Sequence, residues 1–226
     1  MLSEAQRYGD IVVEDFTDSY TNLTLKSVFM LKWVVNHCSS VPFVLKTDDD
    51  MLINIEGLLK ELTNNMYKPS QPMIIGMIQK WARPYRSRSS KWYLPSWLYP
   101  EKYLPKFASG TGYVMTRRAV TDIYSKSLDV PLIPLEDVFI TGLVANNNLH
   151  IPLINVPRFL NNRPWLLKPC LYHHLITAHE LTPSQLKDLW TALKALNPAT
   201  CDSYYARLLA FTFGKGRYEV ITNVEW

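Results

Sequence analysis

Short apolar runs alternate with amphipathic helical segments along most of this 226-residue sequence. Residues 41–46 and 73–78 are brief and mostly apolar, which is typical of strands that are buried on both faces. Apolar residues recur at helical spacing between them, most clearly over residues 55–62, which Asn54 precedes as a helix N-cap. This alternation predicts an α/β fold in which helices flank a mostly parallel central sheet.

The same patterns predict further elements. Thr182 is followed by Pro183 and Gln185, which is the signature of a capping box with proline at the first helical position. No linker divides the chain, so we expect residues 1–201 to form one domain and residues 202–226 to form a C-terminal tail. The remaining elements that we expect are the end of a strand at 10–13, a strand at 112–115 and helices at 22–36, 118–125 and 136–147.

Composition restricts the class of partner. The net charge of +4 is too small by itself to indicate nucleic-acid binding, so we expect no nucleic-acid partner. The chain has 7 Trp and 13 Tyr, which favours a site that stacks on flat ligands, although a Trp-rich core explains part of this number. No apolar run of about 18 residues is present, so we expect any membrane anchor to lie outside this sequence.

The segment Lys46-Thr47-Asp48-Asp49-Asp50 is the most informative about chemistry. Three consecutive carboxylates repel one another unless they are solvated or bound to a cation. Here they follow an apolar strand, at the position where open α/β sheets bind ligands. Mn²⁺ and Mg²⁺ prefer carboxylate oxygens and bridge them to diphosphates. The run therefore predicts a metal site, and the alternative is an acidic turn that caps the next helix.

Three further features each have two interpretations. Glu136-Asp137 at a helix start is either a favourable partner of the helix dipole or the source of a general base. His179 is either a structural histidine among apolar neighbours or a ligand that joins the acidic run. Gly110 and Gly112 either let the backbone approach a ligand closely or form an ordinary turn.

Residues 79–105 form a long segment rich in Trp, Tyr, Arg and Pro, and a loop of this length in a compact domain is usually functional. Trp92 and its aromatic neighbours offer a stacking surface for a sugar. The cations of the loop form either a solvated face or a clamp on a diphosphate. They are Arg83, Arg86, Arg88 and Lys91.

Taken in order, these segments resemble the β-1,3-galactosyltransferases and their β-1,3-N-acetylglucosaminyltransferase and fringe relatives (glycosyltransferase family 31). The resemblance extends from Tyr8 to Cys201. Each segment is weak alone, and together in this order they are specific. They are Gly9-Asp10-Ile11, Asp15-Phe16, Asp18-Ser19-Tyr20, Asn22-Leu23-Thr24-Leu25-Lys26, Lys46-Thr47-Asp48-Asp49-Asp50, Ser90-Lys91-Trp92-Tyr93, Tyr99-Pro100, Ser109-Gly110-Thr111-Gly112-Tyr113, Glu136-Asp137-Val138 and Ile176-Thr177-Ala178-His179.

The resemblance implies a GT-A type fold that lacks its N-terminal part, a UDP-sugar donor and Mn²⁺ as cofactor. It implies a glycan acceptor on a glycoprotein or glycolipid, and a type II membrane protein on the lumenal side of the Golgi. The reaction it implies is inverting transfer of a hexose, with galactose preferred, to the 3-hydroxyl of the acceptor. The alternatives are a truncated, non-catalytic module that binds UDP or glycans, and a metal-dependent phosphoesterase, for which further closely spaced ligands are missing.

The resemblance also assigns roles to residues. It makes Asp137 the catalytic base and Asp50 and His179 the metal ligands. It allows Cys38 and Cys170 to pair. The residues expected at the donor are Lys46, Asp48, Asp49, Trp92, Gly110, Gly112 and Glu136.

Overall fold

A computed structural model describes residues 2–65 and 67–201, and its centre is a four-stranded sheet in the order β1-β4-β3-β5. The sheet consists of β1 (Phe43–Thr47), β3 (Ile74–Gln79), β4 (Phe107–Thr116) and β5 (Leu153–Asn155). Only β3 and β5 pair in parallel, whereas β4 runs antiparallel to both β1 and β3. The prediction of a mostly parallel sheet was therefore wrong, because an apolar strand covered on both faces has the same composition whichever way its neighbour runs.

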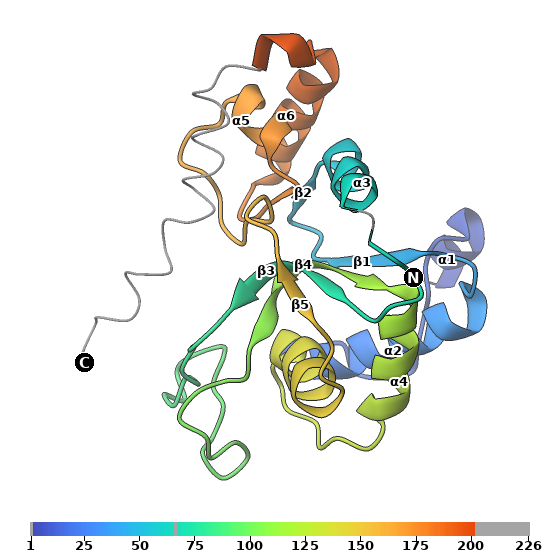
Figure 1. Ribbon diagram of the computed structural model, residues 1–226, viewed down its shortest axis with the longest axis vertical. Coiled ribbons are helices and arrows are strands. Elements are labelled where there is room, and N and C mark those ends of the chain that lie inside the picture. The colour runs from blue at the N-terminus through green and yellow to red at the C-terminus, as the bar shows by residue number, and fades with distance from the viewer. Residues whose placement is uncertain (1, 66, 202–226) are drawn as a thin grey trace.

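Helices cover both faces of this sheet (Figure 1). On one side lie α2 (Leu23–His37), α4 (Arg117–Ser127) and the π-helix η2 (Val138–Asn148). On the other side lie α3 (Ile55–Asn64), α5 (Pro169–His174) and α6 (Pro183–Ala195). The two-sided covering confirms the α/β class that the sequence predicted.

Each face of the sheet has its own apolar cluster. Tyr113 and Met115 of β4 pack in the cluster on the α2 and α4 side, while Val114 between them packs in the cluster with α3 and α5. Successive side chains of a strand point to opposite faces, so a strand between two layers must be apolar along its whole length. This requirement explains the continuous apolar runs of β3 and β4.

Several predicted helix boundaries are close to those observed. The Asn54 side chain accepts a hydrogen bond from Gly57 N at the start of α3, and Thr182 and Gln185 form the capping box of α6. The expected strand at residues 10–13 is absent. Helix α1 (Leu2–Tyr8) ends just before it, and Val12 and Val13 are exposed without a partner strand.

The long segment at residues 80–106, called the aromatic loop below, contains no helix or strand and projects from the ends of β3 and β4 (Figure 1). Arg86 fixes its shape from within, because its guanidinium donates hydrogen bonds to the carbonyls of Leu94, Tyr99 and Glu101 at 2.6, 2.7 and 3.0 Å. The hydrogen bonds of Arg86 are thus made within the loop, and the other cations of the loop are the candidates for contact with a ligand.

A second, two-stranded sheet pairs β2 (Leu52–Ile53) with β6 (Thr177–Ala178). Strand β2 follows the acidic run (residues 48–50), and β6 immediately precedes His179. Asn54 strengthens this junction, since its backbone N–H donates to Ile176 O and its side chain to His173 O and Leu175 O. The small sheet therefore holds two segments together that are more than a hundred residues apart in sequence.

The disulfide bond joins Cys170 to Cys201, so the pair of Cys38 and Cys170 that the resemblance allows does not form. Cys38 follows α2 on one side of the main sheet, whereas Cys170 belongs to α5 on the other (Figure 1). The sheet separates them. The expected tail after Cys201 lies outside the described residues. Within the part of the chain that is described, no helix has the length and apolar character needed to cross a bilayer.

Candidate active site

A broad cleft opens where β1 leaves the main sheet, and residues from distant parts of the chain line it. Thr47, the last residue of β1, pairs with Gly112, so the acidic run begins beside Gly110 and Thr111 of β4. Glu136, Asp137, His179 and the aromatic loop contribute the remaining walls. The cleft therefore gathers most of the side chains that the sequence singled out.

Asp48, Asp50 and His179 form a group that can hold a metal ion, with one ligand atom from each lying within 4.8 Å of the others. His179 Nδ1 lies 3.3 Å from the carbonyl of Asn161, which can only accept, so this nitrogen carries the hydrogen. His179 Nε2 then faces Asp50 Oδ2 at 3.1 Å. Two acceptor atoms this close repel unless a proton or a cation lies between them, so the arrangement is compatible with a bound divalent ion.

Asp49 lines the same cleft but is not part of this three-residue group. The acidic run therefore divides by position: its first and third residues converge with His179, and the middle one does not. Asp48 directly follows β1, whereas Asp49 and Asp50 lie in a turn, so this turn and not an extended strand sets which side chains converge.

Asp137 lies at the N-terminus of η2 with both carboxylate oxygens engaged. Oδ2 accepts from Gly110 N at 3.0 Å and Oδ1 accepts from Val138 N at 2.9 Å. A Cβ atom on residue 110 would lie 3.2 Å from Asp137 Cβ, so a side chain at this position would crowd Asp137. Burial, followed by the charge of Glu136, raises the pKa of Asp137 to about 6, which suits a base that works near neutral pH.

Lys46 connects the two acidic parts of the cleft. Its Nζ lies 2.7 Å from Asp48 Oδ1 and 3.5 Å from Glu136 Oε2, and it donates to Gly110 O at 2.6 Å. Burial opposes the charge of Lys46, but Glu136 and Asp48 outweigh it and raise its pKa. Lys46 therefore remains a cation that holds the acidic run against the start of η2.

Glu136 is buried and also accepts a hydrogen bond of 2.6 Å from Tyr113 Oη. Its two partners, Lys46 and Tyr113, compensate the cost of burying its charge. Gly112, in contrast, packs against Thr177 of β6, where a Cβ atom would lie 3.3 Å from Thr177 Cγ2. Glu136 therefore has two partners within the protein, and Gly112 allows β4 to pack closely against β6.

An aromatic wall closes one side of the cleft. Trp92 lies 5.2 Å from Tyr85 between ring centres, and Lys91 Nζ lies 4.7 Å above the Trp92 ring. Tyr20 joins them from η1 (Tyr20–Asn22), and its pKa is raised by burial and by the charges of Asp137 and Asp48. Sequence reasoning did not assign Tyr20 to the site, although the segment that contains it was part of the resemblance.

Comparison with known proteins supports the class that this fold and site define. A family model described as galactosyltransferase matches residues 1–157, and the chain belongs to this family. It is 34% identical over 203 residues to beta-1,3-galactosyltransferase 2 of Homo sapiens, which covers 89% of this chain and 48% of that protein. It is 35% identical over 198 residues to beta-1,3-galactosyltransferase 1 of Mus musculus, covering 88% and 60%.

The chain thus spans only about half to three fifths of the length of these relatives. The family match includes the acidic run and Asp137, while His179 falls beyond its end at residue 157. The structure nevertheless brings His179 to the acidic run through the pairing of β2 with β6.

Proposed function

We propose that this protein is an inverting β-1,3-hexosyltransferase that transfers galactose from UDP-galactose to the 3-hydroxyl of an acceptor glycan. The observation that carries this proposal is the meeting of two different sites in one cleft. One is the Asp48, Asp50 and His179 group, and the other is Asp137 with its raised pKa. Family membership favours galactose over other hexoses.

The donor set of the three-residue group suits Mn²⁺, because two carboxylates and one imidazole are oxygen and nitrogen ligands of the kind that this ion accepts. When bound, the ion supplies positive charge that offsets the charge of the donor diphosphate. Asp50 and His179 would hold the ion. Asp48 would offer a carboxylate oxygen as a third ligand, and it also accepts a hydrogen bond from Lys46.

In the proposed reaction, Asp137 accepts the proton of the acceptor 3-hydroxyl. The oxygen forms a bond to the anomeric carbon as the bond from that carbon to UDP breaks on the opposite face, so the configuration inverts. The backbone N–H groups of Gly110 and Val138 hold the carboxylate in position. The proposed donor contacts are Lys46, Asp48, Asp49, Trp92, Gly110, Gly112 and Glu136.

The proposal extends to the setting of the reaction. A β-1,3-galactosyltransferase of this kind has a GT-A type fold and works on glycoprotein or glycolipid acceptors at the lumenal side of the Golgi membrane. The second candidate is a non-catalytic module that binds UDP or glycans, and the observation that favours it is the aromatic wall of the cleft, which offers a stacking surface without any catalytic step.

A donor panel separates the two candidates. The purified protein is incubated with Mn²⁺, a mixture of β-linked N-acetylhexosamine and hexose acceptors, and UDP-galactose, UDP-N-acetylglucosamine or UDP-N-acetylgalactosamine in turn. We expect transfer from UDP-galactose, and product analysis should show a new β-1,3 linkage. Binding of UDP with Mn²⁺ but no transfer from any donor would reject the enzyme in favour of the binding module.

A further inference from the structure

The loop end of the cleft gathers cations that lack a carboxylate partner. Lys80 and Arg83 line the cleft, and Lys102 and Lys106 lie in the same segment. Across residues 2–65 and 67–201, none of these four side chains forms an ion pair. Burial and the charge of Lys80 lower the pKa of Lys106, so these two ammonium groups are close enough to repel.

Aromatic rings hold part of this charge in place. The Arg83 guanidinium lies 5.7 Å from the centre of the Tyr103 ring, and Lys102 Nζ lies 5.4 Å from it. A hydrogen bond from Arg83, together with the charge of Lys102, lowers the pKa of the Tyr103 hydroxyl. Trp81 meets the same ring edge to face, with 6.0 Å between centres. The positive charge is therefore arranged around a flat aromatic surface.

Both the backbone conformation and the solvent exposure of Trp81 are unfavourable. Its φ of 61° lies in the left-handed region, which is costly for a bulky side chain, and 73% of its surface is exposed. Residues held in such conformations concentrate at ligand sites, where binding makes use of the arrangement. Trp81 lies between Lys80 and Arg83 on the cleft wall, so this surface suits a flat ring that carries negative charge.

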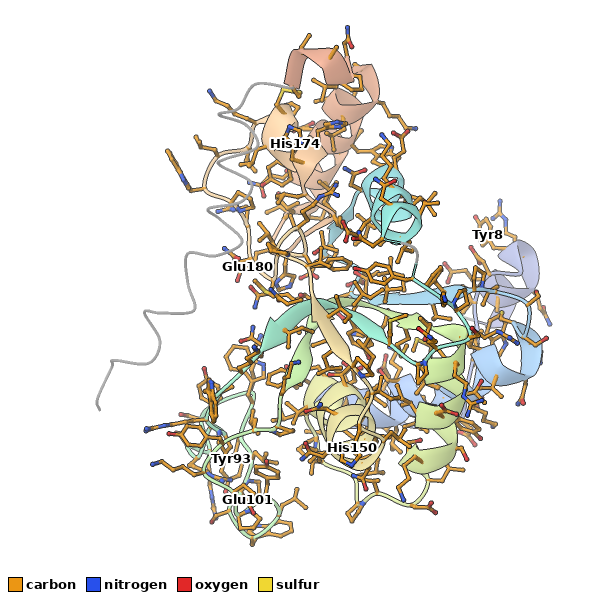
Figure 2. All side chains as sticks on the ribbon, in the orientation of Figure 1. Tyr8, Tyr93, Glu101, His150, His174 and Glu180 are labelled. Carbon is orange, nitrogen blue, oxygen red and sulfur yellow. A yellow bond between two sulfur atoms is a disulfide. The ribbon has the colours of Figure 1, made fainter. Side chains whose placement is uncertain are left out.

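The position of this surface separates it from the reaction centre. Gly110 contacts Asp137, and Phe107 lies three residues earlier on β4, opposite Gln79. Three strand residues span about 10 Å, so the point where the aromatic loop leaves the sheet lies about that far along β4 from Gly110. In Figure 2, Glu180, the neighbour of His179, lies on one side of the sheet ends, and Tyr93 and Glu101 of the aromatic loop lie on the other.

We propose that Lys80, Trp81 and Arg83 form a subsite for an acidic sugar unit of the acceptor, one that bears a carboxylate or a sulfate. The ring of this unit stacks on Trp81, and its anionic group is bound by Lys80 and Arg83. The inference rests on the proposed function, since it names the class of acceptor for the same cleft. The subsite lies at the end of the cleft away from the metal ligands, so it leaves room there for the donor diphosphate.

The test compares three trisaccharides that differ only in one internal unit, which is a uronic acid, a sulfated hexose or the uncharged hexose. Their affinities are measured by calorimetry without donor, at low and at high salt. We expect at least one anionic trisaccharide to bind about tenfold more tightly than the neutral one, which is the effect of a charge-assisted hydrogen bond. The preference should shrink as salt rises.

Two variants with equal charge loss make the comparison specific. Lys80→Gln with Arg83→Gln should abolish the preference and leave neutral binding unchanged. Lys187→Gln with Lys194→Gln is the matched control, because both cations are exposed on α6 and Lys194 also lies over an aromatic ring, 5.0 Å from the centre of Trp190. Melting temperatures show whether both variants are folded.

Equal affinity for all three trisaccharides, or the same loss in the control variant, would overturn the inference. Binding to anionic vesicles with no difference among the trisaccharides would also overturn it, by assigning the charge to a membrane surface. The transfer assay is read separately. Equal transfer to neutral and anionic acceptors would reject the subsite and leave the function, whereas anionic preference without transfer from any donor would reject the function alone.

Discussion

At the residue scale, the chemistry of the site depends on which partners surround each charged group. Asp137 has two backbone donors, and Glu136 has Lys46 and Tyr113. The two adjacent carboxylates thus differ in environment: Glu136 is paired and buried, while Asp137 has a pKa raised to about 6 and faces the cleft. Two neighbouring carboxyl groups in such different environments can take different roles, and we propose that Asp137 is the base while Glu136 supports it.

Replacement of Asp137 by Asn tests this difference. The variant lacks a proton acceptor, so we expect turnover to fall by about 10²- to 10⁴-fold while UDP affinity in Mn²⁺ stays the same. In the unmodified protein, Asp137 is protonated below its pKa, so kcat/KM should decline as the pH falls through about 6. Rates from pH 5 to 8, with calorimetric UDP binding as the control, check both points. A variant that retains ordinary turnover would exclude Asp137 as the base.

The sequence allowed the residues that line the cleft to be predicted better than their partners. The acidic run was recognisable because three carboxylates after an apolar strand need a counter-charge. Tyr20 was missed, because the resemblance gave its segment no role and only folding brings its side chain to Trp92. The hydrogen bond from Gly110 N to Asp137 could not be predicted either, since it joins residues that are distant in sequence.

At the element scale, the short β2–β6 sheet is the feature that assembles the proposed metal site. Asp50 lies just before β2 and His179 just after β6, and their facing atoms are 3.1 Å apart. Asn54 closes this unit, because it caps α3 and binds the carbonyls of His173 and Leu175. The capping role of Asn54 was predictable from sequence, whereas its bonds to α5 were not.

Replacement of Asn54 by Ala should therefore weaken metal binding as well as stability. Loss of the cap alone costs about 1 kcal/mol, and loss of a positioning partner behind metal ligands typically lowers affinity by about 10- to 100-fold. Titration of Mn²⁺ followed by electron paramagnetic resonance measures the affinity, and thermal unfolding measures the stability.

The matched control is Thr182→Ala, which removes the N-cap of α6 but none of the bonds between α3 and α5. We expect it to lower stability by a similar amount and to leave Mn²⁺ affinity near that of the unmodified protein. If both variants bind Mn²⁺ with unchanged affinity, Asn54 acts only as a helix cap.

At the scale of the whole molecule, sequence patterns predicted the layers but not the direction of the strands. Residues 73–78 are apolar because both sheet faces are covered, and that requirement is the same beside a parallel or an antiparallel neighbour. The pairing of the cysteines could not be predicted for a related reason. Which of Cys38 and Cys201 lies on the side of Cys170 is decided by the path of the chain around the sheet, and local sequence does not specify that path.

The same path determines whether the proposed function is possible, because it must bring the acidic run, Asp137 and His179 to one cleft. Binding of Mn²⁺ to the full chain, followed by electron paramagnetic resonance with and without UDP, tests this most directly. We expect one ion per chain, strong loss of binding in both Asp50→Ala and His179→Ala, and retained binding in Asp137→Asn. Unchanged Mn²⁺ affinity in the first two variants would contradict the proposed metal site and the mechanism built on it.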